Sequence, residues 1–267
     1  MNFGNKVVVV TGAGSGMGRE LTLELLHRGA RVAAVDLRAE NLAKTAELAN
    51  ESERLSTHVL DVTDRAAVEH LPQAVVTRHG TVDVVINNAG IIQPFVMIDD
   101  LNYDTIHRVF DVNLFGTLHV TKAFLPLLLE RPEAHIANVS SMGGFLPVPG
   151  QAIYGASKAA VKLMTEALYA ELIETKVGVS VVMPGAIATD IMTNSGVHLE
   201  LDDDAAAGSK SLPADEAARD ILDGIEAGDL HILVGNDSKL MMLANRIAPE
   251  SSIRLIQRQM RDLLHHD

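Results

Sequence analysis

Short apolar segments alternate with longer amphipathic segments along most of the chain, and this alternation predicts its secondary structure. The apolar segments are rich in β-branched residues, as strands usually are. Residues 7–10 are consecutive valines, and an apolar run without polar interruptions suits a strand that is buried on both faces of a sheet. We predict strands at residues 6–10, 31–35, 56–60, 82–86, 135–139, 178–183 and 231–234.

The segments between the strands place apolar side chains at helical spacing. In the first of them, Leu21, Leu25 and Leu26 fall on one face of a helix. We predict helices at residues 19–28, 40–50, 65–78, 103–129 and 152–175. Repeated alternation of strands and helices predicts an α/β protein: a single Rossmann-type, doubly wound domain whose seven-stranded parallel sheet carries helices on both faces.

Two segments depart from this alternation. Residues 190–212 are polar and irregular and include an acidic run at 202–204, so we expect either a lid or a surface loop there. Residues 236–267 follow the last predicted strand and again carry apolar residues at helical spacing. We expect one domain over residues 1–235 and a C-terminal helical extension over 236–267, which packs on the same domain or on a subunit interface.

Composition narrows the classes of function. The 267 residues suit one large domain, and the net charge of −13 argues against a nucleic-acid partner, because an acidic surface repels phosphate. The absence of cysteine excludes disulfides, thiolate metal ligands and cysteine nucleophiles. No apolar run approaches the roughly 18 residues that a membrane span needs. We expect a soluble, cytoplasmic protein with no membrane span.

Small or polar residues follow six of the seven predicted strands. In open α/β sheets ligands bind at the carboxyl ends of the strands, so the sequence predicts one binding site along one edge of the sheet. In chain order these residues are Gly12, Gly14, Gly16 and Gly18; Asp36; Asp61; residues 87–90; Ser140 and Ser141; and Pro184, Gly185 and Thr189.

The glycine cluster suits a phosphate-binding turn. Glycine lets the backbone turn tightly and approach a ligand, and the helix that follows offers free N–H groups to a pyrophosphate. The spacing differs from the strict G-x-G-x-x-G pattern, so a purely structural glycine turn is the alternative. Asp36, at the end of the second strand, lies where a carboxylate accepts hydrogen bonds from an adenosine ribose, which favours NAD over NADP. Arg38 is the one nearby cation that opposes this preference, and capping of the next helix is the alternative role for Asp36.

Tyr154 and Lys158 are four residues apart and therefore share one face of a predicted helix. An ammonium group beside a phenol stabilises the phenolate, which makes the tyrosine a usable acid and base near neutral pH. Such pairs are common, and packing with a solvated lysine is the alternative. The position of the pair, shortly after Ser141 at the predicted binding edge, favours the chemical role.

Together these motifs resemble the short-chain dehydrogenase/reductase family over about residues 5–235. The matching segments are TGAGSGMG at 11–18, NNAG at 87–90, YGASK at 154–158 and PGAIAT at 184–189, together with Asn113 and Ser141. The resemblance implies that Tyr154 exchanges a proton with the substrate oxygen, that Lys158 lowers the pKa of Tyr154 and binds the nicotinamide ribose, and that Ser141, rather than Ser140, hydrogen-bonds the substrate. It also implies that Asn113 holds a water molecule that links Lys158 to solvent.

The resemblance further implies a cofactor site and no metal. Its expected contacts with the dinucleotide are Gly12, Ser15, Gly16, Met17, Gly18, Asp36, Asp61, Val62, Asn88, Tyr154, Lys158, Ile187 and Thr189.

We expect an NAD-dependent alcohol dehydrogenase or carbonyl reductase that acts on an apolar secondary alcohol or ketone, assembled as a homo-tetramer or homo-dimer. The alternatives are an NADPH-dependent ketoreductase of the same family and a dinucleotide-binding sensor without turnover. The apolar tail after residue 235 departs from family members that reduce acyl-carrier thioesters, which argues against a role in fatty-acid synthesis.

Overall fold

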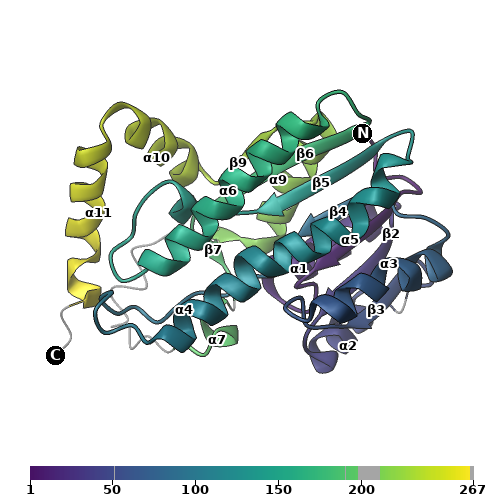
Figure 1. The fold of residues 1–267 in the computed structure, drawn as a ribbon, viewed down its shortest axis with the longest axis horizontal. Helices are drawn as coiled ribbons and strands as arrows, with labels where there is room; N and C mark the ends of the chain where they lie inside the picture. Colours follow the sequence, from purple (N-terminus) through teal and green to yellow (C-terminus); the bar gives the residue numbers. More distant parts are fainter. Residues whose placement is uncertain (51, 190, 198–210, 265–267) are drawn as a thin grey trace.

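The computed structural model describes residues 1–50, 52–189, 191–197 and 211–264. Its centre is a parallel sheet with strand order β3-β2-β1-β4-β5-β6-β9 (Figure 1). The strands are β1 (Val7–Thr11), β2 (Arg31–Asp36), β3 (Leu55–Val59), β4 (Val84–Asn87), β5 (Ala134–Val139), β6 (Val177–Pro184) and β9 (His231–Val234). The predicted seven-stranded parallel sheet is therefore confirmed. A short parallel pair, β7 (Ile187–Ala188) with β8 (Leu212–Pro213), lies apart from it.

Helices cover both faces of the sheet. They are α1 (Gly16–His27), α2 (Ala39–Leu48), α3 (Arg65–His79), α4 (Tyr103–Phe110), α5 (Thr117–Leu129), α6 (Ala152–Leu172), α7 (Ile191–Asn194), α9 (Ala214–Ala227), α10 (Asn236–Ile247) and α11 (Pro249–Leu264). The doubly wound Rossmann-type class predicted from the sequence is confirmed by this arrangement.

The valine run of β1 shows why the strands are apolar throughout. Val7 and Val9 pack into one core cluster with residues of α3, α5 and α6, whereas Val8 and Val10 pack into a second cluster with residues of α1 and α9. All four side chains are fully buried. Because successive residues of a strand point to opposite faces, a strand between two helical layers needs an apolar residue at every position.

Helix α9 is absent from the sequence prediction. Its buried residues recur at helical spacing and pack against the core beside α1: Ala217, Ala218, Ile221, Leu222 and Ile225. Asp215 and Glu216 lie in its first turn, where negative charge interacts favourably with the helix dipole. The signal is therefore present in the sequence, but it begins directly after the irregular acidic segment, and two of its five buried residues are alanine.

The predicted helix over residues 103–129 is interrupted. A π-helical segment, Asp111–Gly116, lies between α4 and α5. By length and composition, Tyr103–Leu129 is also the one described helical stretch that is apolar enough to cross a membrane. Here α5 packs against β4, β5 and α3, and its buried residues, among them Phe124 and Leu128, belong to the core cluster under the sheet.

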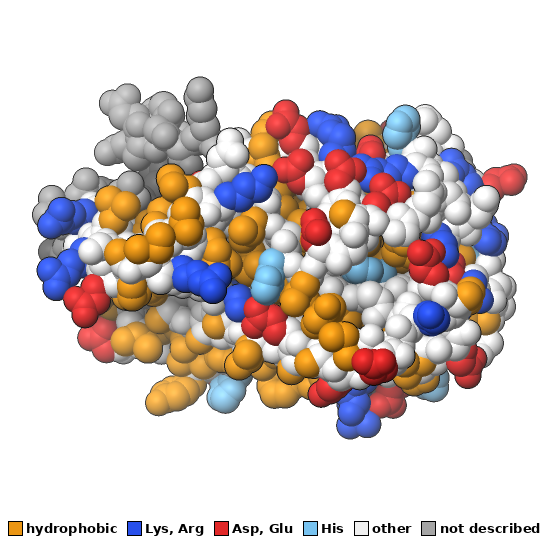
Figure 2. All heavy atoms as spheres, turned by 90° about the horizontal axis from the view of Figure 1, so that it is seen from above, with side chains coloured by type: hydrophobic (Ala, Val, Ile, Leu, Met, Phe, Trp, Pro, Cys, Tyr) orange, Lys and Arg blue, Asp and Glu red, His pale blue; other side chains and the backbone are white. Residues whose placement is uncertain are grey.

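The C-terminal helices α10 and α11 follow β9. Ser238 of α10 donates to the Met183 carbonyl at 2.8 Å, and the Asn245 amide donates to the Phe145 carbonyl at 2.9 Å. Leu240, Leu243 and Ile247 of α10 remain exposed, and Figure 2 shows hydrophobic side chains on the surface at that end of the molecule. The division at residue 235 stays a prediction, and most of the predicted lid, residues 190 and 198–210, lies outside the described residues.

The strand order reverses beside β1. The chain passes from β1 to β2 and β3 on one side, and then returns to β4 on the other side of β1. At such a switch point the connections leave the strand ends in opposite directions, which opens a crevice at the carboxyl ends. The glycine cluster follows β1 and the Asn87–Asn88 pair ends β4, so both predicted motifs meet at this crevice.

A buried histidine makes the fold acid-sensitive. The His135 ring lies inside the protein with Nε2 2.8 Å from the Ser180 hydroxyl, and burial lowers the pKa of His135 to about 4. The unfolded chain binds a proton at this ring below about pH 6.5, whereas the folded protein does so only near pH 4, so stability is lost as the pH falls between these values. We expect this ring to remove about 3 kcal/mol of unfolding free energy over that interval.

In a His135→Gln variant that part of the loss should be missing, as measured by urea unfolding at pH 7 and pH 4.5. His70→Gln, which replaces an exposed histidine, is the matched control and should keep the full loss. An unchanged loss in His135→Gln would contradict the account.

Candidate active site

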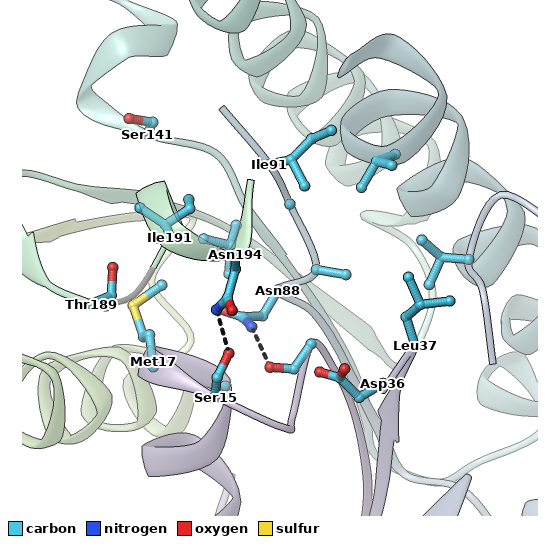
Figure 3. A pocket seen from close by; sticks show the side chains of 18 of the residues that line it. Ser15, Met17, Asp36, Leu37, Asn88, Ile91, Ser141, Thr189, Ile191 and Asn194 are labelled. Carbon is cyan, nitrogen blue, oxygen red and sulfur yellow. Dashed lines mark hydrogen bonds between the residues drawn. The ribbon is translucent and has the colours of Figure 1, made fainter. Parts of the chain in front are cut away.

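The carboxyl ends of the central strands open onto one cavity of about 310 Å³. Figure 3 shows side chains from the ends of several strands pointing into it, among them Asp36, Asn88 and Ser141. All residues predicted to contact a dinucleotide line this cavity: Gly12, Ser15, Gly16, Met17, Gly18, Asp36, Asp61, Val62, Asn88, Tyr154, Lys158, Ile187 and Thr189. Ser141 lines it as well, whereas Asn113 lies behind the wall.

The turn after β1 requires glycine for two different reasons. Gly12 has a φ of +66° and Gly16 a φ of +48°, a backbone conformation that glycine adopts without strain. Gly18 has no room for a side chain, because a Cβ atom there would collide with the Gly12 carbonyl. Helix α1 starts at Gly16 beside the cavity, and Ser15 makes no side-chain cap. The first N–H groups of α1 are therefore available to an anion.

Asp36 braces the glycine turn from the end of β2. Its Oδ2 accepts from the Gly14 N–H at 2.9 Å, and its Oδ1 accepts from the Arg38 N–H at 3.0 Å. Helix α2 begins after Arg38, so this carboxylate bonds to the residue before the helix rather than to its first turn. Because a carboxylate has about four acceptor positions, Asp36 keeps acceptor capacity at the cavity wall.

Lys158 is a buried cation. Its ammonium group donates to the Val139 carbonyl at the end of β5 at 2.9 Å, and 3% of the residue is exposed. Burial lowers the pKa of Lys158 to about 8, because desolvation disfavours its charged form. The backbone at Gly90 passes so close that a Cβ atom there would lie 3.1 Å from the Lys158 Nζ, which explains the small residue.

Tyr154 and Ser141 face each other at the same end of the cavity. Burial raises the pKa of Tyr154, and its hydrogen bond with Ser141 lowers that pKa in part. The Lys158 ammonium group bonds to the Val139 carbonyl instead, and the lowering of the Tyr154 pKa by Lys158 stays a prediction. Ser140 is committed elsewhere, since its hydroxyl donates to the Lys158 carbonyl at 2.7 Å. The contact of Ser141 with the substrate stays a prediction.

Asn113 lies in the π-helical segment and is fully buried. Its amide nitrogen donates to the Ile91 carbonyl and to the Ser157 hydroxyl, both at 3.0 Å, and its amide oxygen accepts from the Ile91 N–H at 2.8 Å. The side chain thereby joins the segment after β4 to α6. It lies near Lys158, because a Cβ atom at Gly90 would lie 3.2 Å from the Asn113 Oδ1 and 3.1 Å from the Lys158 Nζ. The water relay assigned to Asn113 remains a prediction.

Comparison with known proteins agrees with this geometry. Residues 6–199 match the family model for short chain dehydrogenase. The chain belongs to the short-chain dehydrogenase/reductase family. SadH from Mycobacterium tuberculosis is 38% identical over 263 residues, which cover 96% of this chain and 95% of SadH. The predicted membership is confirmed, and this dehydrogenase/reductase is an oxidoreductase.

Solved structures of the family superpose on most of the chain. A short-chain dehydrogenase/reductase from Burkholderia phymatum in complex with NAD has a TM-score of 0.84 and 29% identity, with 96% of both chains covered. A short-chain dehydrogenase from Burkholderia cenocepacia in complex with NADP has a TM-score of 0.82 and 27% identity, with coverage of 96% of this chain and 99% of that chain. These structural relatives carry different nicotinamide dinucleotides.

Sequence reasoning missed the residue that fixes the start of α6 in this dehydrogenase/reductase. Gln93 is fully buried, and its Oε1 accepts from the N–H groups of Ile153 and Tyr154, both at 2.9 Å. Its amide nitrogen donates to the Gly150 carbonyl at 2.9 Å. The residue before α6 makes no side-chain cap, and Gln93, which lies 60 residues before Ile153, caps the helix instead. No local pattern in the sequence marks such a distant cap.

Asp237 of α10 is a second missed residue. Its Oδ2 accepts from the Ala186 N–H at 2.8 Å, and its carboxylate fills the space in which Gly185 would carry a Cβ atom. Asp237, in the first turn of α10, therefore holds the turn of residues 184–186 in place. The sequence signal was the small residue at 185, but it does not reveal which group approaches it.

Gly18→Ala should destabilise the protein by about 3 kcal/mol, because the new methyl group collides with the backbone of the glycine turn at Gly12. Gly80→Ala is the matched control. It places the same methyl group at a positive φ of +87° in open space, so only the conformational strain of about 1 kcal/mol applies. Urea unfolding measures both, and equal losses in the two variants would contradict the collision at Gly18.

Proposed function

We propose that this protein transfers a hydride between a nicotinamide dinucleotide, with NAD favoured, and an apolar secondary alcohol or ketone. The observation that carries the proposal is that Tyr154, Ser141 and a buried Lys158 line the same cavity as the glycine turn and Asp36. A protein that only binds a dinucleotide has no use for a phenol placed for proton exchange, which argues against the sensor alternative.

The residues at hand fit a dinucleotide. The N-terminus of α1 suits a pyrophosphate, and Asp36 offers acceptors to ribose hydroxyls. Glycine at positions 18 and 90 avoids side chains that would collide with the Gly12 carbonyl and crowd the Lys158 ammonium group. When bound, the nicotinamide supplies the hydride chemistry. The B. phymatum structure in complex with NAD and the B. cenocepacia structure in complex with NADP support this class of cofactor.

In the reduction direction we assign the proton to Tyr154. The phenol donates it to the carbonyl oxygen as that oxygen gains negative charge, and the Ser141 hydroxyl hydrogen-bonds the same oxygen. Lys158 stabilises the negative charge that remains on the tyrosine, because a nearby ammonium group favours the phenolate form. In the oxidation direction the phenolate takes the proton from the alcohol.

An apolar substrate agrees with the walls of the cavity, which include Ile91, Ile187 and Ile191. Leu146, on the loop after Ser141, is fully buried in the protein interior and does not line the cavity. Family resemblance suggests a cytoplasmic homo-dimer or homo-tetramer. The exposed apolar residues Leu163 and Tyr169 on α6, and Ile173 directly after it, support that proposal.

Tyr154→Phe should leave NADH binding within about twofold and lower turnover by at least about a hundredfold, since it removes only the proton donor. A panel of apolar secondary alcohols and ketones, followed at 340 nm, identifies a substrate for the assay. Tyr169→Phe is the matched control, because it makes the same chemical change further along α6 at an exposed position. Retained turnover in Tyr154→Phe would refute the role of Tyr154.

Asp36→Ala should weaken NADH binding and strengthen NADPH binding, each by about tenfold, because it removes both the ribose acceptor and the charge that repels a 2′-phosphate. Fluorescence titration measures both dissociation constants. Glu40→Ala removes a neighbouring carboxylate that is exposed on α2, and it should change neither constant. If both affinities were unaltered in Asp36→Ala, the role proposed for Asp36 would be refuted, whereas a parent protein that prefers NADPH would favour the NADPH-dependent ketoreductase.

A further inference from the structure

A polar bridge crosses the cavity between two of its walls. Asn194, the last residue of α7, donates through its Nδ2 to the Ser15 hydroxyl at 2.9 Å, as the dashed line in Figure 3 shows. Its Oδ1 accepts from the Arg38 Nη1 at 2.9 Å, and its carbonyl accepts from the Arg38 Nη2 at 3.2 Å. One side chain from α7 thus joins the glycine turn after β1 to the segment after β2.

Arg38 is the cation that a 2′-phosphate would meet. Among the described residues that line the cavity, Arg38 and Lys158 are the cations, and Lys158 is buried against Val139 at the opposite end. Arg38 lies two residues beyond Asp36, which we assign to the adenosine ribose. A guanidinium group two residues beyond the ribose-binding carboxylate is suited to bind the phosphate that distinguishes NADP from NAD.

The bridge pairs this guanidinium group with Asn194 and not with Asp36. Both of its described hydrogen bonds go to Asn194, and the Asp36 carboxylate accepts from backbone N–H groups instead. Arg38 is exposed, and both Arg38 and Asn194 also line an outer hollow of about 610 Å³. The side chain therefore has room to change direction when its partner is removed.

We propose that Asn194 determines cofactor specificity by holding Arg38 away from the 2′-phosphate position. This inference rests on the proposed function, since it needs a dinucleotide in the cavity. It extends the role given to Asp36: the carboxylate repels the phosphate, and Asn194 withholds the nearby positive charge that would compensate.

The test is the ratio of the dissociation constants for NADPH and NADH, measured by fluorescence titration. In Asn194→Ala the ratio should fall about fivefold, because one charge-assisted hydrogen bond to Arg38 is lost while the backbone bond remains. In Asn194→Asp the ratio should rise, because a carboxylate pairs with the guanidinium group and holds it more firmly. Opposite shifts from two substitutions at one position are not expected from a purely structural role.

Two controls isolate the contact. In the Arg38→Ala background, Asn194→Ala should leave the ratio unchanged, since the charge that it would release is absent. Thr193→Ala changes an exposed neighbour in the same short helix and should also leave the ratio unchanged.

Each result has a distinct meaning. An unchanged ratio in Asn194→Ala, or a fall that persists without Arg38, would overturn the role of Asn194 and leave the proposed function intact. A parent protein that already prefers NADPH would overturn it too. If the parent bound neither dinucleotide, the proposed function would fail and this inference with it.

Discussion

The burial of one ammonium group organises the site. Lys158 lies under the cavity and donates to the carbonyl at the end of β5, so helix α6 must meet the sheet at that point. A buried cation without a partner is strongly unfavourable, and the lowered pKa of Lys158 shows that desolvation is already felt. The close backbone at Gly90, the bond from Ser140 to the Lys158 carbonyl and the Gln93 cap on α6 all serve to keep this geometry.

The strand order explains how distant segments share one cavity. Because the order in which the strands are added reverses beside β1, the glycine turn and the end of β4 face the same crevice. Residues at the ends of β5 and β6 extend the wall of the cavity from there. The residues that we propose bind the dinucleotide and the residues that we propose exchange the proton therefore line one continuous cavity. The Asn194 bridge and the Asp237 contact then fasten the C-terminal part of the chain onto the same edge.

The sequence was sufficient to predict the sheet and many of the residues that line the cavity, because both depend on local signals. Apolar runs such as residues 7–10 mark strands, and small or polar residues at strand ends mark the binding edge. The roles of Gln93, Asn194 and Asp237 depend instead on contacts between residues far apart in the chain, which no local pattern encodes. The π-helical segment that carries Asn113 escaped prediction because its composition is that of an ordinary helix.

The central claim is that the cavity binds a nicotinamide dinucleotide with its reactive end toward Tyr154. Titration of the purified protein with NADH, followed by the fluorescence of the dihydronicotinamide, tests it most directly. The account predicts saturable binding of one NADH per chain, with displacement by NAD. No saturable change with either NADH or NADPH would contradict the account.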